Sequence, residues 1–102
     1  MSAYILSEDA DLDLDDIWEY IAQDNVDATD RWIGKLFDAF EAVGRATGIG
    51  HKCEDLTDHP VLFFPEGAYL IIYCAIRPTV EIVAVTQGAR DIPSFLHRRL
   101  SR

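Results

Sequence analysis

The sequence predicts an α+β protein in the order β-α-α-β-β-β, with an N-terminal helical hairpin packed on a small antiparallel sheet and a short C-terminal helix. Two apolar runs, Ala68 to Ile76 and Val80 to Thr86, are separated by the break Arg77-Pro78-Thr79, a pattern typical of a β-hairpin. Before them, apolar residues recur at every third or fourth position in two consecutive stretches, which indicates two helices. A chain of 102 residues is expected to form one domain over residues 1–102.

The first helix is predicted directly after a short strand at Ala3 to Leu6. Ser7 is a good N-cap, and Glu8 and Asp9 suit the positive end of the helix dipole. Most other positions of this helix are acidic, but one stripe is apolar and consists of Leu14, Ile17, Trp18 and Ile21. We expect one side of the helix to be buried and the other to carry the acids.

The second helix is predicted after a polar break, where Asn25 or Asp27 can act as the N-cap. It should run to about Val43, with Gly44 as its C-terminal stop. Its apolar positions follow helical spacing, and we interpret them as a stripe that faces the core: Ala28, Trp32, Leu36, Phe37, Phe40 and Val43.

Three shorter elements complete the prediction. Residues 47–51 form a connector rather than a phosphate-binding loop, because no strand precedes them and no helix follows. Val61 to Phe64 is a third strand, which the turn Pro65-Glu66-Gly67 joins to the hairpin. Asp91 caps a last short helix that has Pro93 in its first turn and ends in the basic residues His97, Arg98 and Arg99.

The first strand of the hairpin is apolar on both faces. One set of alternate side chains is Leu70, Ile72, Cys74 and Ile76, and the other is Tyr69, Ile71 and Tyr73. The helices can cover one face, and a chain of this length has little left to cover the other. We therefore expect the side that carries Tyr69, Ile71 and Tyr73 to be exposed and to bind a partner protein.

The charge distribution disfavours a general nucleic-acid binder. The chain has 18 acidic and 9 basic residues, and its first 30 residues contain ten acids and no Lys or Arg. Because binding to phosphate backbones requires a positive patch, no strong direct binding to nucleic acid is expected. The absence of a leader or a spanning segment predicts a cytoplasmic protein without a membrane partner. The two cysteines, Cys53 and Cys74, are expected to be reduced thiols.

The acids of the first helix have two further interpretations. Asp11, Asp15 and Asp16 could hold a hard cation such as Mg²⁺, but no ligand converges on them from elsewhere in the chain, and we expect neither a metal nor a cofactor. Alternatively, the acidic face meets basic residues, either Arg98 and Arg99 of the same chain or a basic patch on a partner.

Several blocks of the sequence, in this order and spacing, resemble the ParE branch of the RelE/ParE toxin superfamily. They are LDDIWEYIA at residues 14–22, GIG at 48–50, FPEGAYLIIY at 64–73 and GARDIP at 88–93, so that the resemblance covers nearly the whole chain. It implies a plasmid-stabilisation type of toxin from a type II toxin-antitoxin module. Such a toxin is held inactive by a cognate antitoxin whose flexible segment wraps its surface.

The superfamily holds two activities. ParE-like members are associated with poisoning DNA gyrase, which would make gyrase a second partner and requires no enzymatic step, whereas RelE-like members cut messenger RNA on the ribosome. Cleavage of RNA needs a base and nearby cations, yet residues 53–76 contain no Lys or Arg. We therefore favour growth inhibition through gyrase. The candidates left for RNA cleavage are His51, His59, Tyr73, Arg77 and Arg90, and a non-toxic relative that still binds antitoxin is a third interpretation.

For binding the antitoxin or the target, we expect anchors on the hairpin, on the aromatic surface of the helices and at the end of the sheet. Buried aromatic residues and arginines commonly supply such contacts. The residues expected to do so here are Trp18, Trp32, Tyr69, Ile71, Tyr73 and Arg90.

Overall fold

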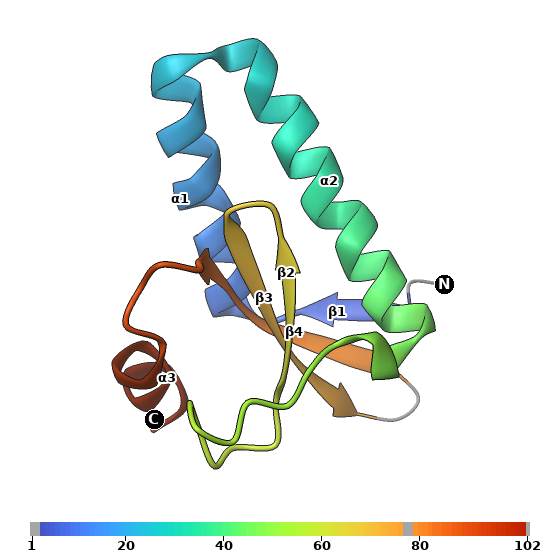
Figure 1. Ribbon diagram of the computed structural model, residues 1–102. Coiled ribbons are helices and arrows are strands. Elements are labelled where there is room, and N and C mark those ends of the chain that lie inside the picture. Colours follow the sequence, from blue (N-terminus) through green and yellow to red (C-terminus); the bar gives the residue numbers. More distant parts are fainter. Residues whose placement is uncertain (1–2, 77–78, 102) are drawn as a thin grey trace.

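The computed structural model describes residues 3–76 and 79–101, and in these the α+β order predicted from the sequence is confirmed (Figure 1). No helix in the described ranges is long and apolar enough to cross a membrane. The elements are β1 (Tyr4–Leu6), α1 (Glu8–Asp24), α2 (Val26–Arg45), a 3₁₀ turn (Thr47–Ile49), β2 (Leu62–Glu66), β3 (Tyr69–Ile76), β4 (Thr79–Gln87) and α3 (Ile92–Leu100).

The sheet has the strand order β1-β4-β3-β2. β3 pairs antiparallel with both β2 and β4, as predicted. β1, however, lies parallel to β4, with Tyr4 opposite Val80 and Leu6 opposite Ile82, so the sheet as a whole is mixed. A parallel pair needs a long crossover connection, and here the helical hairpin forms part of it. The three residues of β1 are too few to show a pattern from which this parallel pairing could be predicted.

Local capping signals define the starts of all three described helices. Ser7 and Asn25 each accept a hydrogen bond from the N–H three residues later, at 3.0 and 3.2 Å. Asp91 caps α3 and accepts hydrogen bonds from the hydroxyl and the N–H of Ser94, at 2.8 and 3.3 Å. These bonds hold the pKa of the Asp91 carboxyl below its usual value, because they favour the charged form.

One face of the sheet packs against the helical hairpin, and this is where the largest core lies. Tyr69, Ile71 and Tyr73 belong to it and are 7%, 0% and 0% exposed, so the prediction that they form an exposed side is wrong. Strand alternation shows that these three side chains share a face but does not show which face the helices cover. The other buried members are Ala10, Leu14, Ile17, Leu36, Ala39, Phe40, Val43, Val80, Ile82 and Val85.

The second face of the sheet is also covered by the chain itself. The segment after the 3₁₀ turn and helix α3 lie over it. A second cluster of buried residues lies between them and the sheet and consists of Val61, Phe63, Ile72, Ala84, Ile92, Phe95 and Leu96. Cys53 packs against this cluster, and both Cys53 and Cys74 are free thiols. The prediction that the chain is too short to cover both faces is therefore wrong, because a four-stranded sheet needs only a nine-residue helix and one loop for this purpose.

A β-bulge in β4 changes which side chains face the helices. Ile72 is opposite Ala84 while Tyr73 is opposite Ile82, which leaves Val83 as an extra residue. As a result Ile82 and Val85, three positions apart, both lie in the core under the helical hairpin, and Ala84 lies in the cluster under α3.

Gly44 lies within α2 rather than after it, so the predicted helix stop is wrong. A Cβ atom at Gly44 would lie 2.6 Å from the carbonyl oxygen of Ala3. The residue is therefore explained by the close approach of α2 to the chain just before β1.

We predict that Gly44→Ala lowers the free energy of unfolding by about 1–3 kcal/mol, because the added methyl overlaps the backbone at Ala3. Gly34→Ala is the matched control: it adds the same methyl to the same helix in open space, and should raise the free energy of unfolding by about 0.5–1 kcal/mol. Urea unfolding of both variants measures the difference. Equal stabilisation by the two substitutions would contradict the close packing of α2 on residue 3.

Candidate binding groove at the sheet edge

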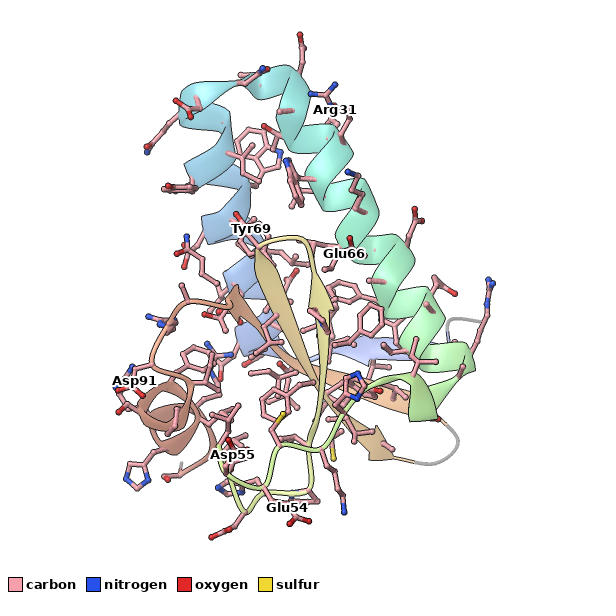
Figure 2. The ribbon with its side chains drawn as sticks, viewed as in Figure 1. Arg31, Glu54, Asp55, Glu66, Tyr69 and Asp91 are labelled. Carbon is pink, nitrogen blue, oxygen red and sulfur yellow. The ribbon has the colours of Figure 1, made fainter. Side chains whose placement is uncertain are left out.

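The candidate site is a groove between α1 and the outer edge of β4. One part of it is a cleft of about 350 Å³ lined by Asp13, Asp16, Ile17, Tyr20, Tyr69, Val85, Thr86, Gln87 and Arg90. A second hollow, of about 430 Å³, shares Asp13, Asp16 and Arg90 with the cleft and continues to Phe95, Arg98 and Arg99 of α3. We call the two together the α1–β4 groove. In Figure 2, Tyr69 is labelled at the start of β3, and Asp91 is labelled beside α3.

The outer edge of β4 is open beside this groove. Pairing with β1 ends at Leu6 opposite Ile82, and the chain then enters α1. In residues 3–76 and 79–101 no strand lies alongside the rest of β4 on that side. The sheet edge therefore presents backbone groups to the groove.

The opposite edge of the sheet, on β2, is protected. The N–H and C=O of Phe63 both pair with the backbone of His51, each at 2.8 Å. Two residues later on the same side stands Pro65, which has no N–H to donate. The β4 edge is thus the better place for another chain to pair with this sheet.

Side chains form hydrogen bonds with some of the backbone groups at the open β4 edge. The carbonyl of Val83 accepts hydrogen bonds from Ser7 Oγ at 3.2 Å and from Arg99 Nη1 at 3.1 Å. The N–H of Val85 donates to Asp13 Oδ2 at 3.0 Å. These contacts hold the bulged part of β4 against α1 and α3.

The Asp13–Arg99 ion pair is the polar centre of this region. Both Nη atoms of Arg99 lie 3.0 Å from the carboxylate oxygens of Asp13, and each of the two side chains is 14% exposed. Arg99 Nε lies 3.7 Å from Asp9 Oδ2. The hydrogen bond with Asp13 raises the pKa of the Arg99 guanidinium, which stays charged.

This pair bears on one interpretation of the acidic helix, its contact with basic residues of the same chain. Contact between the acids of α1 and a basic residue of the same chain is present, and it uses Arg99. Asp13 is therefore largely buried rather than part of the solvent-exposed acidic face. Within the described residues no group of three or more His, Cys, Asp or Glu is arranged to hold a metal ion.

Arg90 is an oriented cation at the junction of the two parts of the groove. Its Nη1 donates a hydrogen bond to Thr86 Oγ1 at 3.2 Å, and its guanidinium lies over the ring of Phe95 at 4.7 Å. The guanidinium of Arg99 lies over the same ring at 4.8 Å. Whereas Arg99 is paired with carboxylates, no carboxylate of the described residues forms an ion pair with Arg90.

The aromatic residues divide between the groove and the core. Trp18 is 45% exposed, whereas Trp32 packs edge-on against Tyr69 at 6.1 Å and carries the Lys35 ammonium over its ring at 5.0 Å. Tyr20 is 63% exposed and lines the groove, although it is not among the binding residues predicted from the sequence. It lies four positions after Asp16 and seven after Asp13, a helical spacing that could have identified it.

Two of the candidates for RNA cleavage, Tyr73 and Arg90, lie in different parts of the fold. Tyr73 is buried, and its hydroxyl donates to the carbonyl of Thr47 at 2.5 Å and accepts from the N–H of Gly50 at 2.9 Å. Burial raises the pKa of Tyr73, which keeps the hydroxyl protonated. It faces the helical hairpin, whereas Arg90 lies beyond the end of β4. Arg77 lies outside the described residues.

The fold and the groove define a small α+β protein with a helical hairpin on one face of its sheet and a partly open sheet edge. The model of the family described as "ParE toxin of type II toxin-antitoxin system, parDE" matches residues 4–92. The chain therefore belongs to the ParE toxin family.

Two further comparisons address related proteins. A solved structure titled "Chromosomal ParDE TA system from P. aeruginosa" has the same fold, with a TM-score of 0.69 and 12% sequence identity over 85% of this chain and 96% of that chain. No curated protein sequence matches the chain.

We predict that Asp13→Ala lowers the free energy of unfolding by about 2–3 kcal/mol, because it removes the bidentate carboxylate partner of Arg99 and leaves the Val85 N–H without its acceptor. Arg45→Ala is the control, since the Arg45–Glu41 pair is exposed and contributes less than about 0.5 kcal/mol. Thermal or urea unfolding measures both. A loss no larger than that of the control would show that the Asp13 carboxylate does not hold α3 and β4 together.

Tyr73→Phe tests whether this hydroxyl is structural. Removing it leaves the Thr47 carbonyl and the Gly50 N–H without a partner, so the free energy of unfolding should fall by about 1–2 kcal/mol. Urea unfolding measures this loss. An unchanged free energy of unfolding would show that the Tyr73 hydroxyl does not hold residues 47–50 against β3.

Proposed function

We propose that this chain is the growth-inhibiting toxin of a type II toxin-antitoxin pair and that its cognate antitoxin binds in the α1–β4 groove. The observation that carries the proposal is the ParE family match over residues 4–92. The groove supports it, because both faces of the sheet are covered and the β4 edge is where backbone groups remain available.

The groove suits an extended polypeptide segment. Ile17, Tyr20 and Tyr69 supply apolar and aromatic surface, Arg90 supplies a cation, and the edge of β4 supplies backbone hydrogen-bonding groups. Aromatic residues and arginine are the residue types that most often anchor protein interfaces. A flexible antitoxin segment that orders on binding could use the apolar surface, the Arg90 cation and the β4 edge together.

Binding of DNA gyrase in the cytoplasm is the mechanism of growth arrest that we favour. It requires no catalytic residues, in agreement with the absence of Lys and Arg from residues 53–76 and with the structural use of Tyr73. Within residues 3–76 and 79–101 no feature specifically favours RNA cleavage. Trp18, half exposed on α1, remains a candidate contact for the target or the antitoxin.

The position of the antitoxin is tested with Tyr20→Ala, which should weaken binding of the cognate antitoxin by about 10–100-fold. Leu12→Ala is the matched control, because Leu12 is similarly exposed on the same helix but does not line the groove, and its effect should stay below about 3-fold. Titration calorimetry measures both. Equal affinities of the two variants would place the antitoxin elsewhere.

The target is tested with purified toxin. We expect it to inhibit supercoiling by gyrase in vitro, and the addition of antitoxin should restore supercoiling. Gyrase that is unaffected at a large molar excess of folded toxin would contradict the proposed target. Normal growth on expression of the toxin alone would contradict toxicity itself.

A further inference from the structure

Arg90 is an exposed side chain that other parts of the chain hold in place. It lies in the connection between β4 and α3. Its Nη1 donates to Thr86 Oγ1 at 3.2 Å, and its guanidinium carbon lies 4.7 Å from the centre of the Phe95 ring. A long exposed side chain ordinarily samples many rotamers, and fixing one of them costs conformational entropy. Contacts with two different elements, β4 and α3, fix Arg90 within the protein itself.

The two residues that hold Arg90 are almost inaccessible. Thr86 and Phe95 are each 5% exposed. Thr86 is paired with Leu70 inside the sheet, and Phe95 belongs to the buried cluster between the sheet and α3. A partner in the groove can therefore form little direct contact with either side chain, whereas Arg90 is open to it and lines both parts of the groove.

Phe95 is itself held by a second arginine. The guanidinium of Arg99 lies over the same ring at 4.8 Å. Arg99 is fixed in turn by Asp13, with both Nη atoms 3.0 Å from the carboxylate, and by the carbonyl of Val83 at 3.1 Å. The face of an aromatic ring attracts cations, and more strongly where water is excluded. Contacts therefore run without interruption from Asp13 through Arg99 and Phe95 to Arg90.

The two arginines on this ring differ in what is left for a partner. Arg99 is bonded to carboxylates, whereas Arg90 forms no ion pair with a carboxylate of the described residues. A guanidinium has five N–H donors, and the bond to Thr86 uses one of those on Arg90. A group that is already ordered loses less entropy when it binds, so that its contacts contribute more to affinity.

We propose that Phe95 and Thr86 are positioning residues for partner binding, which hold Arg90 in the orientation in which it contacts the antitoxin without contacting the antitoxin themselves. The proposal rests on the proposed function, in that the antitoxin binds in the α1–β4 groove. The alternative is that Phe95 serves only the core under α3, where an apolar side chain of another shape would do as well.

The first test follows Arg90 in the free toxin by NMR of its Nε–H group. Phe95→Leu keeps an apolar side chain under α3 but removes the aromatic face, so the Arg90 Nε–H should lose its ring-current shift and its order parameter should fall by at least about 0.2. Leu96→Val is the matched control, because it alters the same buried cluster without touching Arg90. Equal Arg90 order parameters in the two variants would overturn the proposal.

Thr86→Val tests the other contact independently of α3. It replaces the hydroxyl by a methyl group of similar size and leaves Phe95 in place, and the order parameter of Arg90 should again fall. An unchanged order parameter would overturn the part of the proposal that concerns Thr86.

The second test measures the affinity of the purified cognate antitoxin by titration calorimetry, at a temperature where every variant is folded by circular dichroism. Phe95→Leu should weaken binding by about 3–10-fold, whereas Leu96→Val should change it by less than about 2-fold. In an Arg90→Ala background, Phe95→Leu should have almost no further effect, because the residue through which it acts is gone. An equal loss with and without Arg90 would overturn the positioning role.

Failure of this inference and failure of the proposed function give different results. Arg90→Ala and Tyr20→Ala should each weaken antitoxin binding by about 10-fold or more. If neither does, the antitoxin binds outside the groove and the proposed site is lost together with this inference. If both do while Phe95→Leu and Thr86→Val leave the affinity unchanged, only the positioning role is lost.

Discussion

The carboxylate of Asp13 connects three parts of the chain that are distant in sequence. It accepts hydrogen bonds from the N–H of Val85, 72 positions away, and from the guanidinium of Arg99, 86 positions away. Arg99 in turn bonds the carbonyl of Val83 in the β-bulge. Because Asp13 and Arg99 are both largely buried, each of these groups would be costly to leave without a partner. The position of α3, the shape of β4 and the placement of α1 are therefore linked.

The position of α3 determines which surfaces a partner can reach. Once Arg99 is held by α1, Phe95 and Leu96 lie over the second face of the sheet, and Phe95 supports the guanidinium of Arg90. Both sheet faces are then covered, and the partly open β4 edge is left between α1 and α3. A sheet edge is a common place for one protein to bind another, because its backbone groups give affinity and its flanking pockets give specificity.

An open sheet edge is also a hazard, since it can pair with other chains without specificity. In this protein the hazard of unspecific pairing is limited at both edges of the sheet. His51 and Pro65 protect β2, and Ser7, Asp13 and Arg99 occupy the Val83 carbonyl and the Val85 N–H, which β4 would otherwise expose. The remaining accessible groups lie beside Tyr20 and Arg90, where side chains can select among partners.

The sequence by itself determined the order of elements, their class and the family to which the chain belongs, because these depend on local signals. The caps at Ser7, Asn25 and Asp91 and the spacing of apolar residues act over three or four positions and are legible in the chain. Arg90 was also identified correctly as an arginine at the end of the sheet, although its role in binding stays a prediction.

Only the tertiary structure decided which surfaces are exposed. Tyr69, Ile71 and Tyr73 were expected outside and are inside, because alternation gives the two faces of a strand without showing what covers each of them. The parallel pairing of β1, the bond from Ser7 to the bulge residue Val83 and the burial of Asp13 are contacts between segments that are 70 or more positions apart. No pattern within a helix or a strand records such contacts, because they form only when the elements have packed.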